Sequence, residues 1–324
     1  MFEPPDANLA PRFTGPRTYA RLPHTDRLDG VDCAIFGMPW DGATTFRPGA
    51  RFGPEAVRSA SGMVRTYNTA QRTQVFGAGS GTRLAGALSC VDYGDAPTVP
   101  GYVEETLRRI EAFVRPIVEA DVVPVGIGGD HSVTLAELRA VAQTTGPLGL
   151  VHIDSHGDLW DDNFGVRYNH GTMFRRAIEE GILDPARMIQ AGIRGPLYTE
   201  EDTRLQENLG VELIPWLELC DLAPSVFADR VRARVGSGPT FLTFDVDFVD
   251  AAFLPGTGTP EIGGPTPHEA LQFLRALDGI DFRAFDVVEV SPPYDGPGQM
   301  TALFAAQAVF ECLSLVARAR AGRN

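Results

Sequence analysis

The feature that most restricts the fold is a regular alternation of short apolar segments with longer segments of helical periodicity. The apolar segments have the length and composition of buried strands, and they fall at 31–37, 88–93, 122–127, 148–154, 188–193, 211–214, 240–245 and 285–290. Helical spacing predicts helices over 102–120, 132–142, 172–181, 199–208, 221–235, 267–277 and 301–320. Strands that alternate with helices form a parallel sheet covered on both faces. The sequence therefore predicts an α/β fold with three α/β/α layers and a mainly parallel central sheet.

Domain organisation follows from the same pattern. Residues 29–324 are expected to form one domain, and residues 1–28, rich in proline and polar residues, predict an arm packed on the surface or on a neighbouring subunit. A long loop rich in glycine and proline follows the first strand and enters a helix near Pro54. A loop of this length inside a compact domain is usually functional.

Composition narrows the classes of function. The net charge is −14 and the pI about 4.9, which argues against a nucleic-acid partner, because binding phosphates requires a basic surface. The chain contains no lysine, which excludes Schiff-base and P-loop chemistry. No apolar run reaches the roughly 18 residues of a membrane span, and no secretory signal is evident at the N-terminus. The four scattered cysteines, Cys33, Cys90, Cys220 and Cys312, predict buried reduced thiols in a cytoplasmic protein.

The stretch 151–174, VHIDSHGDLWDDNFGVRYNHGTMF, holds the densest group of chemically active residues. Asp154, His156 and Asp158 follow an apolar strand at spacing i, i+2, i+4. Extended backbone would place all three on one face, with Ser155 and Gly157 pointing the other way. Two carboxylates beside an imidazole must face water or hold a cation, because burying them unpaired is unfavourable. Taken alone, the pattern also fits a polar turn after a strand.

Other predicted strands end in similar residues. His131 lies in GGDHS after strand 122–127, Asp245 and Asp247 follow strand 240–244, and Glu289 follows strand 285–288. Each is weak evidence alone; a histidine such as His131 is often structural. In parallel sheets, however, functional groups gather at the carboxyl ends of the strands. We therefore expect these side chains at one edge of the sheet.

The candidate metal ligands are two histidines and four aspartates: His131, Asp154, His156, Asp158, Asp245 and Asp247. This set is too large for one catalytic zinc, which usually has three protein ligands. It suits a pair of divalent cations whose charge balances four carboxylates. Carboxylate-rich ligation with some imidazole favours manganese over zinc, although cobalt, nickel and iron stay open. Such a pair lowers the pKa of water toward neutrality and provides a hydroxide nucleophile.

Four motifs together resemble the signatures of the ureohydrolase (arginase/agmatinase) family: GGDHS, D-x-H-x-D, DVDFVD followed by PGTGTPEIGG, and VEVSPPYD. The resemblance runs in order from about Phe36 to the C-terminus. HGTMF and VSPPYD are similar to the agmatinase-like branch. The resemblance implies an arginase-like fold and two Mn²⁺ ions per subunit, in a homo-oligomer, a trimer or a hexamer. It also implies that one ion is held by His131, Asp154, Asp158 and Asp245, and the other by Asp154, His156, Asp245 and Asp247.

The resemblance further implies roles for two residues outside the ligand set. His170 would deliver a proton to the leaving amine, and Glu289 would pair with the guanidinium; with Asp158 they are the predicted catalytic residues. Chemistry supports both roles, because a carboxylate orients a guanidinium and a histidine titrates near neutrality. The predicted substrate contacts are Glu289, His170, Trp160, Asp161 and Asn169.

The sequence departs from the family at three positions. Ser155 replaces the usual alanine, Gly157 a larger residue and Ile262 a proline. The loop 159–169 leaves the substrate open. Its aromatic and acidic residues, Trp160, Asp161, Asp162 and Phe164, could surround a second cationic end, as agmatine needs. Arg167 or Arg47 could instead receive a carboxylate.

The sequence thus predicts hydrolysis of the terminal guanidino group of a small linear substrate, with release of urea and an amine. Agmatine, giving putrescine, is the first choice, and 4-guanidinobutyrate and 3-guanidinopropionate are the alternatives. Two other hypotheses are a metal-dependent amide deacetylase and a catalytically silent subunit. His131 and Asp247 argue against the first, and the complete ligand set argues against the second.

Overall fold

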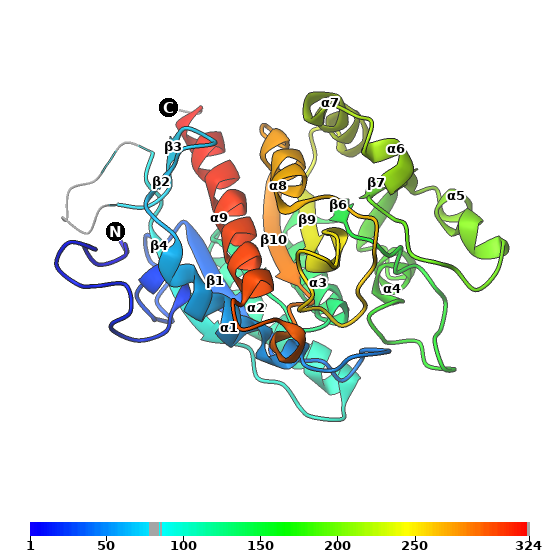
Figure 1. The fold of residues 1–324 in the computed structure, drawn as a ribbon, viewed down its shortest axis with the longest axis horizontal. Helices are drawn as coiled ribbons and strands as arrows, with labels where there is room; N and C mark the ends of the chain where they lie inside the picture. Colours follow the sequence, from blue (N-terminus) through cyan, green and yellow to red (C-terminus); the bar gives the residue numbers. More distant parts are fainter. Residues whose placement is uncertain (78–83, 85, 323–324) are drawn as a thin grey trace.

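The central sheet has eight strands in the order β4-β1-β5-β10-β9-β6-β7-β8, and every neighbouring pair is parallel (Figure 1). The structure is a computed structural model, and it describes residues 1–77, 84 and 86–322. The strands are β1 (Cys33–Gly37), β4 (Cys90–Asp95), β5 (Val123–Ile127), β6 (Leu148–Ile153), β7 (Leu183–Ala191), β8 (Glu212–Ile214), β9 (Thr240–Asp245) and β10 (Phe282–Val288). The predicted parallel α/β architecture is confirmed.

Helices cover both faces of this sheet. One face packs against α1 (Gly53–Ala60), α7 (Pro224–Val235), α8 (Pro267–Ala276) and α9 (Met300–Ala321). The other packs against α2 (Val103–Glu119), α3 (Thr134–Thr145) and α4 (Met173–Glu179). The alternation of side chains along each strand supplies the two cores: on β1, Ile35 belongs to the first and Phe36 to the second. Strands buried on both faces explain the continuous apolar runs of the sequence.

Helix α9 lies against the sheet as a core helix (Figure 1). Among the described residues it is the one helix with the length and apolar composition of a membrane span. However, 83% of its apolar window is buried inside the protein. Burial on most sides explains why its apolar residues show no single hydrophobic stripe.

The first 28 residues divide into two parts. Most side chains before Tyr19 are exposed or half-buried, whereas Tyr19 and Leu22 belong to the core. The backbone N–H of Tyr19 donates to Asp92 Oδ2 at 2.7 Å, and its hydroxyl donates to the carbonyl of Ala306 in α9 at 2.8 Å. The segment 19–22 of the predicted surface arm is therefore built into the domain, because its aromatic and apolar residues fill the core.

Several element boundaries differ from the predicted ones. β7 begins at Leu183 instead of 188, and its register with β6 shifts between Leu148 and Leu150. The predicted helix 221–235 begins at Pro224, after a separate short helix, α6 (Trp216–Leu219). The other short elements are the helix α5 (Leu205–Leu209) and the hairpin formed by β2 (Tyr67–Asn68) and β3 (Thr73–Gln74). Two-residue strands carry no detectable period, so the hairpin was not predicted.

The cysteine prediction needs one correction. Cys33, Cys90 and Cys312 are buried free thiols, as expected, whereas Cys220 is exposed. It follows the short helix α6, whose presence the sequence pattern did not reveal.

The sheet order explains how the candidate site is assembled. β5, β10, β9 and β6 are consecutive neighbours at the centre of the sheet. Val288 at the end of β10 pairs with Asp245 at the end of β9, and Ile153 at the end of β6 pairs with Phe244. Residues that follow these four strands therefore emerge side by side at one edge.

A buried ion pair joins the N-terminal segment to this sheet and generates a stability prediction. Arg58 binds Asp92 through two hydrogen bonds, of 2.8 and 3.0 Å, and binds Asp95 at 2.5 Å. The side chain of Asp92 is 2% exposed and that of Asp95 is 48% exposed. We expect Asp92→Ala to lower the free energy of unfolding by about 3–5 kcal/mol, because it removes the buried carboxylate that pairs with Arg58 and leaves Arg58 Nε and the N–H of Tyr19 without their acceptor.

The matched control is Asp95→Ala, which removes a carboxylate from the same arginine at the solvent boundary. It should cost about 1 kcal/mol or less. Urea denaturation of the two variants measures the difference. Equal losses would mean that burial of the Arg58–Asp92 pair does not matter to stability.

Candidate metal centre and active site

The loop after β6 does not follow the predicted extended path. The strand ends at Ile153, and Asp158 adopts a left-handed conformation with φ of 50°. Ser155 does not point away from the site: its hydroxyl donates to Asp247 Oδ1 at 2.6 Å. A Cβ added at Gly157 would lie 2.6 Å from Gln206 Nε2. Asp158 thus reaches the site through a turn in the backbone. A non-glycine residue with positive φ is uncommon and often marks a functional position.

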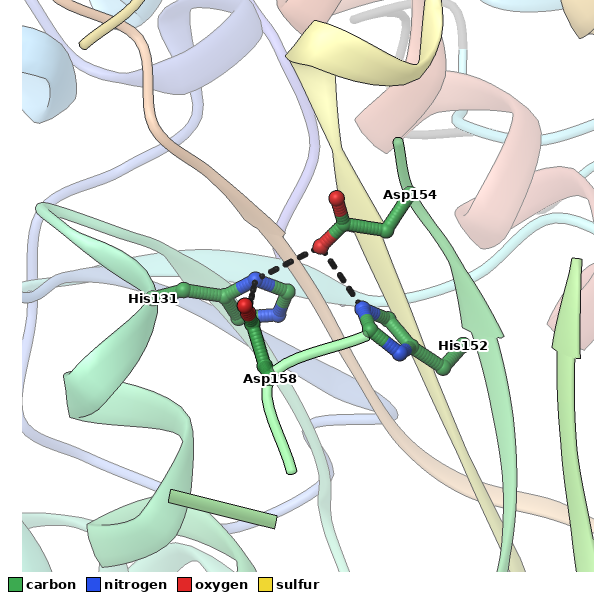
Figure 2. A group of neighbouring side chains, drawn as sticks. All are labelled: His131, His152, Asp154 and Asp158. Carbon is green, nitrogen blue, oxygen red and sulfur yellow. Dashed lines mark hydrogen bonds and ion pairs between the residues drawn. The ribbon is translucent and has the colours of Figure 1, made fainter. Parts of the chain in front are cut away.

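The first group of candidate ligands surrounds one ring nitrogen of His131 (Figure 2). His131 Nδ1 lies 3.1 Å from Asp154 Oδ2, 3.2 Å from Asp158 Oδ2 and 3.3 Å from Asp245 Oδ2. The other ring nitrogen, Nε2, lies 2.8 Å from the hydroxyl of Thr243. Nδ1 is buried and has no hydrogen-bond partner among the described residues. An imidazole nitrogen in this position, facing three carboxylate oxygens, is arranged for a cation.

A second group lies beside the first and shares one residue with it. His156 Nδ1 lies 3.0 Å from Asp247 Oδ2 and 3.6 Å from Asp154 Oδ1. His156 Nε2 lies 3.5 Å from Glu261 Oε1, which orients the ring. Asp154 therefore contributes Oδ2 to the first group and Oδ1 to the second. All six predicted ligands are brought together, in two adjoining sets.

Burial makes this cluster unfavourable without added positive charge. Burial and the neighbouring carboxylates raise the pKa of Asp245, and burial raises the pKa of Asp247. Burial also acts to raise the pKa of Asp154, but the surrounding imidazoles outweigh it and lower that pKa. The carboxylates raise the pKa of His131 and His156 despite burial. Four carboxylates and two imidazoles in two adjoining sets fit a pair of divalent cations, which would neutralise them.

Glu289 follows β10 and adopts φ of 65°. Its Oε1 accepts hydrogen bonds from the backbone N–H of His131 and from His170 Nδ1, both at 2.9 Å. Its Oε2 is buried and has no hydrogen-bond partner among the described residues. A Cβ added at Gly258 would lie 3.3 Å from this oxygen, so a side chain at this position would crowd it. Glu289 thus offers one free carboxylate oxygen beside the candidate metal ligands.

His170 is held between Glu289 and Thr45. Its Nε2 lies 3.1 Å from the backbone nitrogen of Thr45 and 2.7 Å from its hydroxyl. Burial lowers the pKa of His170, but Glu289, Asp130 and Asp158 raise it more, to about 9. The N–H of Thr45 suits the neutral ring, and its hydroxyl can accept from the protonated ring. His170 can therefore hold or release a proton without moving.

The loop after β1 holds the backbone of His170 through Ala43. Asp130 Oδ2 accepts the backbone N–H of Ala43 at 2.9 Å, and the carbonyl of Ala43 accepts the N–H of His170 at 3.2 Å. Burial and the charge of Glu289 raise the pKa of Asp130 to about 7. Neither Thr45 nor Asp130 was singled out from the sequence. The unusual length of the loop that carries Thr45 was the available signal.

A cavity of about 310 Å³ opens onto these groups. Its lining residues are Thr45, His156, Asp158, Trp160, Asn163, His170, Gly171, Pro196, Leu197, Tyr198, Asp245, Thr259 and Glu289. We call the part lined by His170, Glu289 and the candidate ligands His156, Asp158 and Asp245 the inner end, and the part lined by Trp160, Asn163 and 196–198 the outer end. The rings of Trp160 and Tyr198 lie 5.6 Å apart.

Some predicted substrate contacts are engaged elsewhere. Trp160 lines the cavity, but Asp161 does not; it forms an ion pair of 2.6 Å with Arg176. Asn169 is buried and accepts the N–H of Gly171 at 2.8 Å, without lining the cavity. Asn163, which the sequence did not single out, lines it instead.

The two arginines considered for a substrate carboxylate also lie outside the lining residues. Arg167 pairs with Glu179 at 2.6 Å. The guanidinium of Arg47 lies over the rings of Phe46 and Tyr294, at 5.1 and 5.2 Å. Such local pairings depend on segments distant in sequence or on loop conformation, which residue type alone does not reveal.

Comparisons with known proteins agree with this geometry. A family model described as the arginase family matches residues 31–314. A guanidinopropionase from Pseudomonas aeruginosa is 44% identical over 320 residues, which cover 98% of this chain and 97% of the relative. A mitochondrial agmatinase from Gallus gallus is 40% identical over 313 residues, which cover 97% and 89%.

A solved structure of the same kind is the proclavaminate amidino hydrolase from Streptomyces clavuligerus. It matches with a TM-score of 0.86 and 38% identity, covering 96% of this chain and all of that one. The resemblance to the ureohydrolase family is thereby confirmed, and the alternative hypothesis of an amide deacetylase is dropped. The chain belongs to the arginase family, and it is a metal-dependent ureohydrolase that acts on guanidino compounds.

Proposed function

We propose that this enzyme hydrolyses a small guanidino acid of the 3-guanidinopropionate or 4-guanidinobutyrate type, releasing urea and an amino acid. The observation that carries this proposal is the charge of the cavity. Among the described lining residues, the acidic side chains are Asp158, Asp245 and Glu289, and all three lie against His131, at the inner end. A second cationic end, as in agmatine, would meet no carboxylate at the outer end. This proposal replaces our first choice from the sequence, agmatine.

The outer end supplies neutral hydrogen-bond donors. Trp160, Asn163 and Tyr198 line it, with the apolar Pro196 and Leu197. An indole N–H, an amide and a phenol can all donate to a carboxylate. The 44% identity with a guanidinopropionase supports the same substrate class, and the 40% identity with an agmatinase keeps agmatine as the alternative.

The proposed cofactor is a pair of Mn²⁺ ions held by the two ligand sets described above. Carboxylates outnumber imidazoles in both sets together, which favours manganese over zinc. When bound, such a pair lowers the pKa of water toward neutrality and so supplies hydroxide at the inner end.

The protein's own residues would orient the substrate and move the proton. Glu289 Oε2 faces the cavity without a partner and would accept the guanidinium N–H groups, which places the guanidinium carbon beside the ligand sets. His170 would then give a proton to the departing amine, because Glu289 and the other nearby carboxylates raise its pKa and favour its charged form. Thr45 and Asp130 hold it in place for that transfer.

The assembly of the chain into a trimer or a hexamer remains a prediction, which light scattering would test.

The first prediction concerns substrate choice. After loading with Mn²⁺, kcat/KM for 3-guanidinopropionate or 4-guanidinobutyrate should exceed that for agmatine at least about tenfold, because the outer end offers donors and no carboxylate. A panel of guanidino compounds that includes arginine, with urea release as the readout, measures this ratio. A higher value for agmatine would reject the guanidino-acid proposal, and no urea from any compound would reject the function as a whole.

The second prediction reverses the charge of the outer end. Asn163→Asp should shift the ratio of kcat/KM toward agmatine by about tenfold or more, since a carboxylate near the far end attracts an ammonium and repels a carboxylate. Asn163→Leu is the matched control, which removes the amide without adding charge. If both variants changed the ratio equally, charge at this position would not select the substrate.

The third prediction separates the roles of Glu289 and His170. Glu289→Gln should raise KM and lower kcat/KM by about 10²–10³-fold, because the guanidinium loses its charged partner. His170→Gln should lower mainly kcat, by about 10²–10⁴-fold, because the leaving amine loses its proton donor. Both variants should still bind two Mn²⁺ ions, as measured by metal analysis. Loss of metal in either variant would show that the residue serves the ligand sets instead.

A further inference from the structure

A third histidine, His152, lies beside the predicted ligands but was not among them. It is on β6 and fully buried, and its Nε2 lies 2.7 Å from Asp154 Oδ2 (Figure 2). Its ring packs against Phe174, with ring centroids 4.5 Å apart. By position alone His152 could be a metal ligand, because one of its ring nitrogens lies within 4.8 Å of candidate ligand atoms of His131, Asp154 and Asp158.

The hydrogen bonds of Gln190 decide which nitrogen of His152 carries the hydrogen. Gln190 is on β7, directly opposite His152 in the parallel register. One end of its amide lies 2.6 Å from the carbonyl of Gly157, so that end must be the NH₂ group. The other end accepts a hydrogen bond from Gln206 at 3.0 Å, which requires an oxygen. The orientation of the amide is therefore determined at both ends.

This orientation determines the tautomer. The NH₂ group of Gln190 also lies 2.8 Å from His152 Nδ1, so it donates its second hydrogen to that nitrogen. Nδ1 must then carry a lone pair, and the ring hydrogen must be on Nε2. Nε2 consequently donates to Asp154 Oδ2 and has no lone pair to offer a cation.

The two predicted histidine ligands have the opposite arrangement. His131 and His156 both direct Nδ1 toward the carboxylates, and they direct Nε2 outward, toward Thr243 and Glu261. His152 directs Nε2 inward and Nδ1 outward. His152 therefore lies among the candidate ligands for a reason other than binding a cation.

His152 acts on Asp154, the residue that contributes one carboxylate oxygen to each ligand set. Asp154 Oδ1 accepts the backbone N–H of His156 at 2.6 Å, and Oδ2 accepts from His152. These two bonds, one on each oxygen, determine the plane of the carboxylate. Gln190 adds a second effect, because its bond to the carbonyl of Gly157 holds the turn between His156 and Asp158.

We propose that His152 is a positioning residue which, with its tautomer set by Gln190, orients the shared carboxylate Asp154 for both cations and is not itself a ligand. The proposal rests on the two-ion centre of the proposed function but not on the identity of the substrate. Hydrogen bonds from such neighbours to metal ligands commonly change metal affinity by 10–100-fold.

The experiment measures Mn²⁺ binding without substrate. His152→Leu removes the donor and should weaken the binding of both ions about 10–100-fold, as followed by the electron paramagnetic resonance signal of free Mn²⁺. His152→Gln retains an N–H group near the position of Nε2 and should restore affinity to within about threefold of the original. His268→Gln, at a histidine of α8 outside the cavity lining, is the control and should leave affinity unchanged.

A second readout separates positioning from ligation. Pulsed electron paramagnetic resonance should detect two imidazole nitrogens on the bound manganese, both in the original protein and in His152→Gln. Three nitrogens, falling to two in His152→Gln, would overturn the proposal in favour of a ligand. Original affinity in His152→Leu, or failure of His152→Gln to restore it, would also overturn it.

If His152→Leu does not fold, Gln190→Met tests the same proposal with His152 present. The substitution removes the amide that sets the tautomer of His152, and the methionine side chain has a shape similar to that of glutamine. The expected result is again a weaker binding of both ions, by about 10–100-fold. Original affinity in this variant would overturn the role of Gln190. Because none of these measurements uses substrate, their outcome is independent of which guanidino compound is hydrolysed.

Discussion

The burial of four carboxylates at one edge of a parallel sheet is the constraint on which the rest of this molecule depends. Asp154, Asp158, Asp245 and Asp247 are each less than a tenth exposed, and repulsion at such short distances would oppose folding unless cations neutralised it. The sheet makes the arrangement feasible, because β5, β10, β9 and β6 are consecutive and each ends at the same edge. Metal binding and folding are therefore linked, and a protein without its ions should hold this edge less firmly.

At this edge the two oxygens of a single carboxylate have different partners. Asp154 offers one oxygen to each ligand set, and Glu289 uses Oε1 for the N–H of His131 and for His170 while Oε2 stays free. Glu289 therefore links the backbone of His131, a candidate ligand, to His170 and keeps one oxygen without a partner among the described residues. The left-handed conformation of Glu289, like that of Asp158, is the backbone distortion that brings the carboxylate there.

Periodicity and motif spacing predicted the sheet, its helices and the gathering of six candidate ligands at one edge, because these depend on local pattern and on the rule that strand ends meet. Other features could not be predicted in this way. Ser155 was expected to face away from Asp247, but the strand ends before it, and a chain of alternating residues does not show where extended backbone stops. His152 was hidden inside an apolar strand, where it resembled a core residue. Asp161 was assigned to the substrate, yet it pairs with Arg176 fifteen residues later, and such a partner is known only from the folded chain.

The separation of the cavity into two ends explains how one family can act on different guanidino compounds. The inner end carries His170, Glu289 and candidate ligands, and its geometry follows from the central strands β5, β10, β9 and β6. The outer end, formed by Trp160, Asn163 and 196–198, comes from loops and contains no ligand. Under the proposed function, a change of side chain there would alter what the far end of the substrate meets without changing the candidate ligands. Relatives named guanidinopropionase and agmatinase, at 44% and 40% identity, are the outcome expected of such an arrangement.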